Sequence, residues 1–143
     1  MDIEASLERA NWLYSQKSFN GVYDLLYPIM LQFQKSQLEL EDESIFQVCL
    51  LLSQSLIELR NPDFYFQVEE YFAIMKGLNL EPELIYLTTG KGYVAMKGFI
   101  GDGYDSDHFL RNKYKEKALT DLRKVIEVCP ENDEAHRLIS NMS

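Results

Sequence analysis

The sequence predicts an all-α protein built from about three antiparallel helical hairpins and a C-terminal capping helix. Apolar residues recur at three- and four-residue steps along nearly the whole chain of 143 residues, as they do on one face of an α-helix. No segment sustains the alternation of apolar and polar residues that is typical of a strand. The helical stretches begin in pairs near residues 3, 42 and 83. A period near 40 residues indicates stacked hairpins.

Composition predicts one domain over residues 1–143. Hydrophobic residues make up 46% of the chain, which is ample for a core. The longest apolar run, Val48 to Leu52, is far shorter than the ~20 residues of a membrane span. The chain opens with Met1-Asp2-Ile3-Glu4, which lacks the basic and apolar pattern of a secretion signal. We therefore expect a cytoplasmic protein that inserts into no membrane.

The first hairpin is predicted over residues 3–38. Apolar residues from Ile3 to Tyr14 follow steps of four, three and four, so they share one face of its first helix. Its second helix contains Pro28, which lacks a backbone N–H and whose ring clashes with the carbonyl of Asp24. We expect a kink or a break at this proline.

The second hairpin, residues 42–79, contains the most apolar helix of the chain. Asp42 or Ser44 is expected to cap the start of this helix. Because it is apolar almost all round, we expect it in the middle of the fold. Asn61 and Pro62 then form a stop and a restart, with Asn61 as N-cap and Pro62 at the first helical position.

The third hairpin, residues 83–129, carries two glycines within a helix, Gly90 and Gly92. Each costs ~1 kcal/mol relative to alanine, which indicates that a neighbouring helix comes very close. Between the two helices of this hairpin we expect an inserted loop at about 98–112. A short capping helix is predicted over 131–142.

Charge is distributed unevenly along the chain. The net charge is −9; residues 1–90 carry fourteen acids and five bases, whereas residues 91–143 carry nine of each. Nucleic acid is not expected as a partner, because phosphate binding needs a positive surface. The segment Arg111 to Lys124 is a local exception, with six bases and two acids. Such a bipolar field favours a basic or zwitterionic partner.

The sequence contains no catalytic signature, and we expect neither an enzyme nor a bound cofactor. Cys49 and Cys129 each lie within an apolar helical stripe, so they are expected to be buried, reduced thiols without a metal. Gly90-Lys91-Gly92 lacks the remaining residues of a phosphate-binding loop.

The predicted loop allows four interpretations. Three acids suggest calcium, but the ligand pattern of an EF-hand loop is missing. A single histidine suggests a metal or a catalytic site, but no second one accompanies it. Aromatic side chains on the loop, Tyr104 and Phe109 above all, are candidate anchors for a partner. Alternatively, the aromatic residues pack back onto the helices and the acids are solvated. The residues concerned are Phe99, Asp102, Tyr104, Asp105, Asp107, His108, Phe109 and Tyr114.

The third hairpin resembles a tetratricopeptide repeat, and the first is similar but looser. Two sets of residues keep that family's spacing: Tyr86, Gly90 and Tyr93 in the first helix, and Ala118, Leu122, Val125 and Pro130 in the second helix and closing turn. The middle hairpin fits only in a shifted register, and a HEAT-like or unclassified α-α array is the alternative. The resemblance implies a right-handed α-α superhelix with a concave groove.

The resemblance also implies which residues line that groove. They lie on the first helix of each hairpin: Glu8, Asn11, Tyr14, Gln47, Gln54, Glu58 and Lys91. Members of the family that hold a C-terminal carboxylate use Lys, Arg and Asn side chains, whereas acids and glutamines stand at most of these positions. We therefore expect a basic or apolar protein segment as the ligand and a disfavoured acidic tail.

Two functions follow as expectations. The first is a non-catalytic protein-interaction module, such as an adaptor, a co-chaperone or an assembly factor. The second is a structural, self-associating α-helical subunit of a larger complex. The aromatic run at residues 63–72 is expected in the core, with a dimer surface as its alternative.

Overall fold

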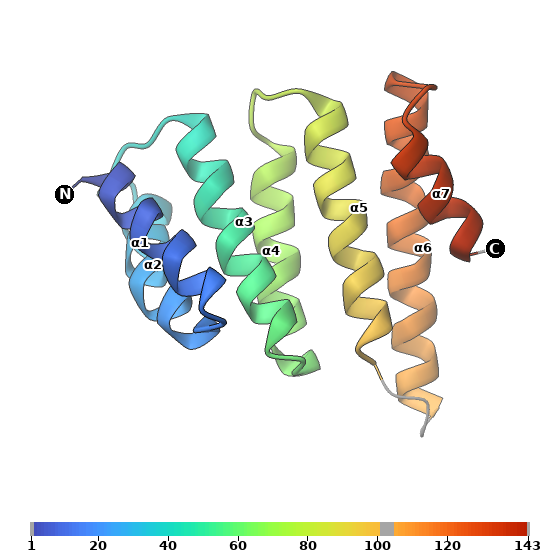
Figure 1. Ribbon diagram of the computed structural model, residues 1–143, viewed down its shortest axis with the longest axis horizontal. Coiled ribbons are helices and arrows are strands. Elements are labelled where there is room, and N and C mark those ends of the chain that lie inside the picture. The colour runs from blue at the N-terminus through green and yellow to red at the C-terminus, as the bar shows by residue number, and fades with distance from the viewer. Residues whose placement is uncertain (1, 101–104, 143) are drawn as a thin grey trace. The chain divides into compact units, whose positions relative to one another are not determined.

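The computed structural model describes residues 2–100 and 105–142, and every regular element it describes there is helical (Figure 1). The all-α prediction is therefore confirmed. Contacts group the chain into two compact units, Met1–Asn79 and Leu80–Ser143, where we had expected one domain. Each unit buries its own set of apolar side chains.

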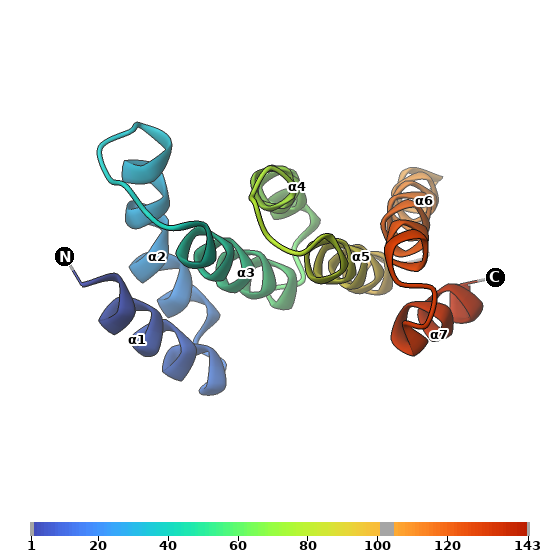
Figure 2. The same cartoon turned by 90° about the horizontal axis from the view of Figure 1, so that it is seen from above.

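The first unit contains four α-helices and one short 3-10 helix. They are α1 (Ile3–Ser15), α2 (Phe19–Gln34), α3 (Asp42–Glu58), η1 (Pro62–Phe64) and α4 (Tyr65–Lys76). The apolar α3 packs against α1, α2 and α4, as expected from its composition (Figures 1 and 2). Leu52 on this helix is fully buried, and so are Val22 and Leu26 on α2 and Val68 on α4. These side chains form the core of the unit.

A polar cluster joins α2 to α4 beside this core. The Gln67 side-chain nitrogen donates hydrogen bonds to the hydroxyl of Tyr23 at 3.0 Å and to that of Tyr71 at 2.7 Å. The ring of Tyr23 stacks on that of Tyr27, with centroids 4.8 Å apart. Burial raises the pKa of Tyr71 well above its ordinary value, so its hydroxyl stays protonated and available to this cluster.

The N-cap residues predicted from the sequence agree with the structure at one helix and differ at another. Asn61 accepts a hydrogen bond from the backbone N–H of Asp63 at 3.0 Å, which confirms it as an N-cap. Asp42 was expected to cap α3, but the N-cap is Glu41 and makes no side-chain bond there. Asp42 instead accepts a hydrogen bond from the backbone N–H of Asn79 at 2.8 Å. It thus links the start of α3 to the segment that follows α4.

A kink or a break was expected at Pro28, and the break is wrong, because α2 runs through this residue without interruption. Pro28 and Asp24, whose carbonyl loses its helical partner, are both exposed. Water can hydrate the carbonyl on this side, so the missing hydrogen bond is tolerated.

The second unit consists of α5 (Pro82–Gly98), α6 (Asp105–Val128) and α7 (Asp133–Met142). The long helices α5 and α6 form an antiparallel pair, and α7 packs against α6 (Figure 1). The predicted close approach of a neighbouring helix occurs at Gly90. A Cβ atom there would lie 2.9 Å from Leu122 of α6.

The loop predicted at about 98–112 is wrong from Asp105 onward, because α6 starts there and is 24 residues long. The apolar face of this helix extends further than the sequence suggested. Leu110 is half-buried, and one turn later the buried ring of Tyr114 stacks on Tyr93 of α5, with centroids 6.0 Å apart. Packing on α5 therefore extends the helix in the N-terminal direction. Tyr104 lies outside the described residues.

Candidate functional site

The predicted groove residues are divided between the two units. Six of them lie in the first unit, and Lys91 lies in the second. We call the surface in the first unit the α1/α3 face, and it comprises Glu8, Asn11, Tyr14, Gln47, Gln54 and Glu58. Helices α1 and α3 are in contact, so the surface is continuous across them.

On α3 the predicted residues share one narrow stripe. Gln47, Gln54 and Glu58 are separated by seven and four residues, so they project from the same side of the helix. Gln47 is exposed, and the other two are half-buried. The same spacing adds Glu43 and Leu50, which the sequence analysis had not selected. The outward stripe of α3 is therefore acidic and amide-rich, with one leucine.

On α1 the predicted residues lie along the edge that faces α3. Asn11 is exposed, and its side-chain nitrogen donates a hydrogen bond to the backbone carbonyl of Leu7 at 2.9 Å. The half-buried ring of Tyr14 meets Phe19 edge-on, with centroids 5.3 Å apart. This contact packs the Tyr14 ring against the start of α2.

Tyr14 and Glu58 are electrostatically coupled. Burial raises the pKa of the Tyr14 hydroxyl, and the negative charge of Glu58 raises it further. The structure thus brings together one predicted residue from each helix of the α1/α3 face. A carboxylate on α3 and a protonated hydroxyl on α1 thus belong to the same face, and a carboxylate suits an incoming ammonium or guanidinium group.

The carboxylates of the α1/α3 face are not neutralised by the fold. Within the described part of the chain, neither Glu8 nor Glu58 makes an ion pair. Arg9, which follows Glu8 in the sequence, lies over the ring of Trp12 at 4.8 Å from its centroid. The face therefore keeps a negative charge at neutral pH.

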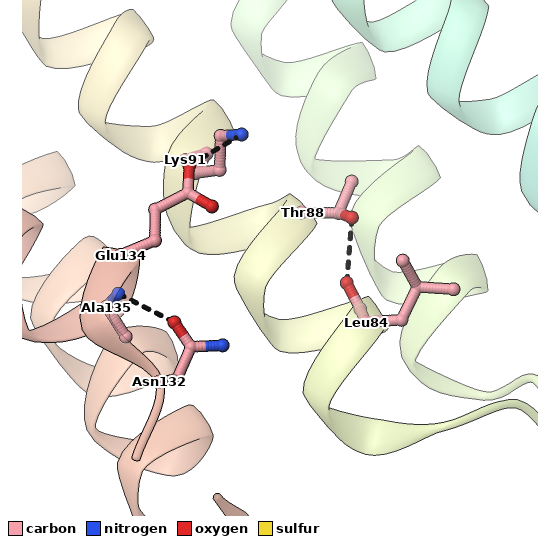
Figure 3. A network of polar contacts seen from close by, with 6 residues as sticks. All are labelled: Leu84, Thr88, Lys91, Asn132, Glu134 and Ala135. Atoms are coloured by element: carbon pink, nitrogen blue, oxygen red, sulfur yellow. Dashed lines mark hydrogen bonds and ion pairs between the residues drawn. The ribbon is translucent and has the colours of Figure 1, made fainter. Parts of the chain in front are cut away.

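Lys91 in the second unit is engaged by the chain itself. Its ammonium group lies 2.9 Å from a carboxylate oxygen of Glu134, which α7 brings beside α5 (Figure 3). Leu84 and Thr88 precede Lys91 on the same side of α5, and the Thr88 hydroxyl donates to the Leu84 carbonyl at 2.7 Å. This ion pair was not predicted from the sequence, because Glu134 lies on a helix more than forty residues after Lys91.

Asn132 fixes the start of α7 at this place. Its side-chain oxygen accepts a hydrogen bond from the backbone N–H of Ala135 at 2.9 Å (Figure 3). Its side-chain nitrogen donates to Glu83 of α5 at 2.8 Å. Glu134 is consequently held where it can reach Lys91. The only lysine among the predicted groove residues is thus already paired.

The aromatic residues of the predicted loop have different environments. Phe109 lies on α6 and is 71% exposed, whereas Tyr114 is buried. Lys113 and Lys117 lie over the rings of Tyr114 and Tyr93, at 5.2 and 5.7 Å from the centroids. Tyr114 thus packs back onto the hairpin, and Phe109 remains available for contact with another molecule.

The described residues hold no group of three His, Cys, Asp or Glu side chains placed to bind a metal ion. His108 is exposed on α6. Asp102, one of the three acids considered for calcium, lies outside the described residues, as do the side chains of Asp105 and Asp107. Cys49 is buried and Cys129 half-buried, and neither forms a disulfide.

Across residues 2–100 and 105–142, no helix has the length and apolarity required to cross a bilayer. Comparisons with protein-family models, with curated proteins and with solved structures yield no match to this chain.

Proposed function

We propose that this chain is a non-catalytic protein-interaction module that binds a basic or apolar segment of a partner protein on the α1/α3 face. The observation that carries the proposal is an amide-rich surface on α1 and α3 whose carboxylates, Glu8 and Glu58, have no basic partner among the described residues. An adaptor, a co-chaperone or an assembly factor in the cytoplasm would use such a surface. The resemblance of the sequence to tetratricopeptide repeats supports the same class of function.

Each part of the α1/α3 face has a chemical role in this proposal. Glu58 accepts charge-assisted hydrogen bonds from a lysine or arginine of the partner. The amides of Gln47, Gln54 and Asn11 can donate and accept, so they suit the backbone of an extended or helical segment. Leu50 supplies an apolar contact in the middle of the stripe. The net charge of −9 attracts a basic segment from a distance.

Binding of two synthetic peptides tests the proposal: one alternates lysine with leucine, and the other alternates glutamate with leucine. Fluorescence anisotropy with a labelled peptide should show tighter binding of the lysine peptide, and the affinity should fall as salt is added. Glu58→Gln should weaken this binding by about five- to tenfold, which corresponds to the roughly 1 kcal/mol typical of a partly exposed ion pair.

Glu70→Gln is the matched control, because Glu70 is exposed on α4, outside the α1/α3 face. It removes the same charge and should leave the affinity within twofold. If Glu58→Gln and Glu70→Gln lose the same affinity for the lysine peptide, the net charge alone explains the binding, and a specific site at Glu58 is contradicted. Tighter binding of the glutamate peptide, with loss on Lys91→Ala, would contradict the proposal altogether.

A structural, self-associating subunit is the second candidate function. Three large apolar side chains favour it, because each is more than half exposed: Trp12 at 52%, Phe66 at 73% and Phe109 at 71%. Phe66 lies in the aromatic run at residues 63–72, most of which is packed in the core as expected.

A further inference from the structure

The outward stripe of α3 has a carboxylate at each end and a leucine at its centre. Its members are exposed or half-buried, and they follow one another at steps of four, three, four and four residues: Glu43, Gln47, Leu50, Gln54 and Glu58. Such steps keep all five side chains on one side of a helix. Leu50 comes seven residues after Glu43 and eight before Glu58, so it divides the stripe in half.

Both terminal carboxylates are accessible to an incoming base. Glu43 is exposed and Glu58 is half-buried, and neither makes an ion pair within the described part of the chain. The first unit as a whole carries twelve acids and five bases, which gives it a net charge of −7. A cation that approaches the stripe is therefore attracted by the field of the unit and by a carboxylate at either end.

The length of the stripe sets the spacing of the two cations that it can hold. Glu58 follows Glu43 by fifteen positions. A helix rises ~1.5 Å per residue, so the two carboxylates are separated by about 22 Å along the axis of α3. A second helix that lies along α3 covers this distance in about four turns, and its residues fourteen positions apart return to the same side. An extended chain covers the same distance with about seven residues.

The groups along the stripe favour a helical ligand over an extended one. An extended chain presents backbone N–H and C=O groups along its whole length, and these groups need partners. Between the two carboxylates the stripe offers the side-chain amides of Gln47 and Gln54, with Leu50 between them. A helix satisfies its own backbone hydrogen bonds and needs only side-chain contacts, which this stripe provides.

We propose that the ligand of the α1/α3 face is an amphipathic helix that lies along α3, with two basic residues fourteen positions apart and an apolar residue midway between them. One base meets Glu58, the other meets Glu43, and the apolar residue packs on Leu50. This inference rests on the proposed function, because it names the kind of segment that the face binds. The contact is smaller than a standard interface, so the complex is weak and its affinity falls as salt is added.

Two labelled peptides of identical composition test the spacing. Each contains two lysines in a helix-forming background of alanine and glutamine, with one leucine between them, and the lysines are either fourteen or seven positions apart. Circular dichroism verifies that the two peptides have the same helix content. Only the fourteen-spaced peptide can reach both carboxylates as a helix. Fluorescence anisotropy should therefore show it to bind about fivefold more tightly, which is the effect of one partly exposed ion pair.

A proline in the peptide separates a helical ligand from an extended one. Replacement of a central alanine by proline breaks the helix of the fourteen-spaced peptide, so it should abolish the tighter binding. The same replacement in the seven-spaced peptide should leave its weaker affinity within twofold, because a contact through one lysine needs no fixed spacing.

Removal of the carboxylate at the other end tests whether the site has two ends. Glu43→Gln should weaken binding of the fourteen-spaced peptide about fivefold. In this variant, replacement of the peptide lysine that meets residue 43 by glutamine should cost no further affinity, as a double-mutant cycle measures. Glu41→Gln is the matched control, because Glu41 is exposed at the same end of α3 but two residues earlier, and so points away from the stripe. It should leave the affinity within twofold.

The possible failures of this inference and of the proposed function are distinct. The helical ligand is overturned if the seven-spaced peptide, or the proline form of the fourteen-spaced one, binds as tightly as the fourteen-spaced peptide. The second end of the site is overturned if Glu43→Gln keeps the wild-type affinity while Glu58→Gln loses it. Either result leaves a site for a basic segment at Glu58 in place. If no lysine peptide binds, both the inference and the proposed function are overturned.

Discussion

A Cβ atom on Gly90 would lie 2.9 Å from Cδ2 and 3.0 Å from Cγ of Leu122. This separation is shorter than real Cβ atoms show, so α5 and α6 approach each other here because residue 90 has no side chain. Leu122 is fully buried, so its side chain could yield only by displacing its neighbours in the core. The contact explains why α5 tolerates a glycine that disfavours the helix on its own.

Gly90→Ala should therefore destabilise the protein, although alanine is the better helix former. We expect a loss of roughly 1–3 kcal/mol in the free energy of unfolding, as is typical of overpacking in a core. Urea unfolding followed by circular dichroism measures it. Gly98→Ala is the control, because nothing lies within 4 Å of its Cβ position, and it should leave the stability unchanged or raise it. A Gly90→Ala protein as stable as the wild type would show that the two helices separate easily.

A buried hydrogen bond lies beside this contact. The hydroxyl of Thr89 donates to a carboxylate oxygen of Asp121 at 2.7 Å, and both residues are almost completely buried. Thr89→Val keeps the shape but removes the donor, so it should cost about 1–3 kcal/mol of unfolding free energy. Thr88→Val is the matched control, since the Thr88 hydroxyl bonds only to the backbone of its own helix. Equal unfolding free energies for the two variants would rule out a stabilising role for the buried pair.

Local sequence signals predicted the helices well where the cause is local. The cap at Asn61 and the role of Gly90 depend on the geometry of a single turn or on a missing side chain, and both were foreseen. The start of α6 was missed because packing of Tyr114 on Tyr93, far away in the sequence, decides it. The alternative of a break at Pro28 was wrong because the exposure of this residue, which makes the missing hydrogen bond tolerable, is a property of the folded unit.

In the candidate surfaces, too, features with a local cause were predicted, and features that depend on contacts between distant helices were not. The resemblance to tetratricopeptide repeats selected Gln47, Gln54 and Glu58, and their spacing places them on one side of α3. The ion pair between Lys91 and Glu134 depends on how α7 meets α5, and nothing in either segment announces it. Trp12 was not selected from the sequence, because its 52% exposure is a property of the folded unit.

Three helices of the first unit end in a left-handed residue that is not glycine. The φ angles are 60° at Lys17, 59° at Ser36 and 57° at Arg60. In this conformation the Cβ atom crowds the backbone, which raises the free energy of a non-glycine residue by on the order of 1 kcal/mol. Glycine has no Cβ atom and avoids this penalty. Lys17→Gly should therefore raise the free energy of unfolding by roughly 0.5–1 kcal/mol, after allowance for the greater freedom of glycine in the unfolded chain.

Thermal unfolding of Lys17→Gly measures this gain as a higher midpoint temperature. Gln16→Gly is the control at the preceding position, where φ is −87° and glycine brings no relief. It should lower the midpoint. A decrease in both variants would mean that the Lys17 side chain contributes more than its backbone costs.

The thiol of Cys49 makes stability depend on pH in alkaline solution. Complete burial raises the pKa of this thiol from 9.0 to about 12. Between these values the thiol ionises in the unfolded chain but stays protonated in the folded one. The unfolded state therefore binds fewer protons, and the stabilising contribution, fully present below pH 9, is lost as the pH rises toward about 12.

Cys49→Ala should remove this dependence. Above pH 9, the unfolding free energy of the wild type should fall by up to about 1.4 kcal/mol per pH unit more than that of Cys49→Ala. Ionising tyrosines are present in both proteins, so their effect cancels in the comparison. Cys129→Ala, which alters a half-buried thiol, should keep the slope of the wild type. Equal slopes in the wild type and Cys49→Ala would mean that Cys49 ionises without unfolding, and hence that water reaches the interface between α3 and its neighbours.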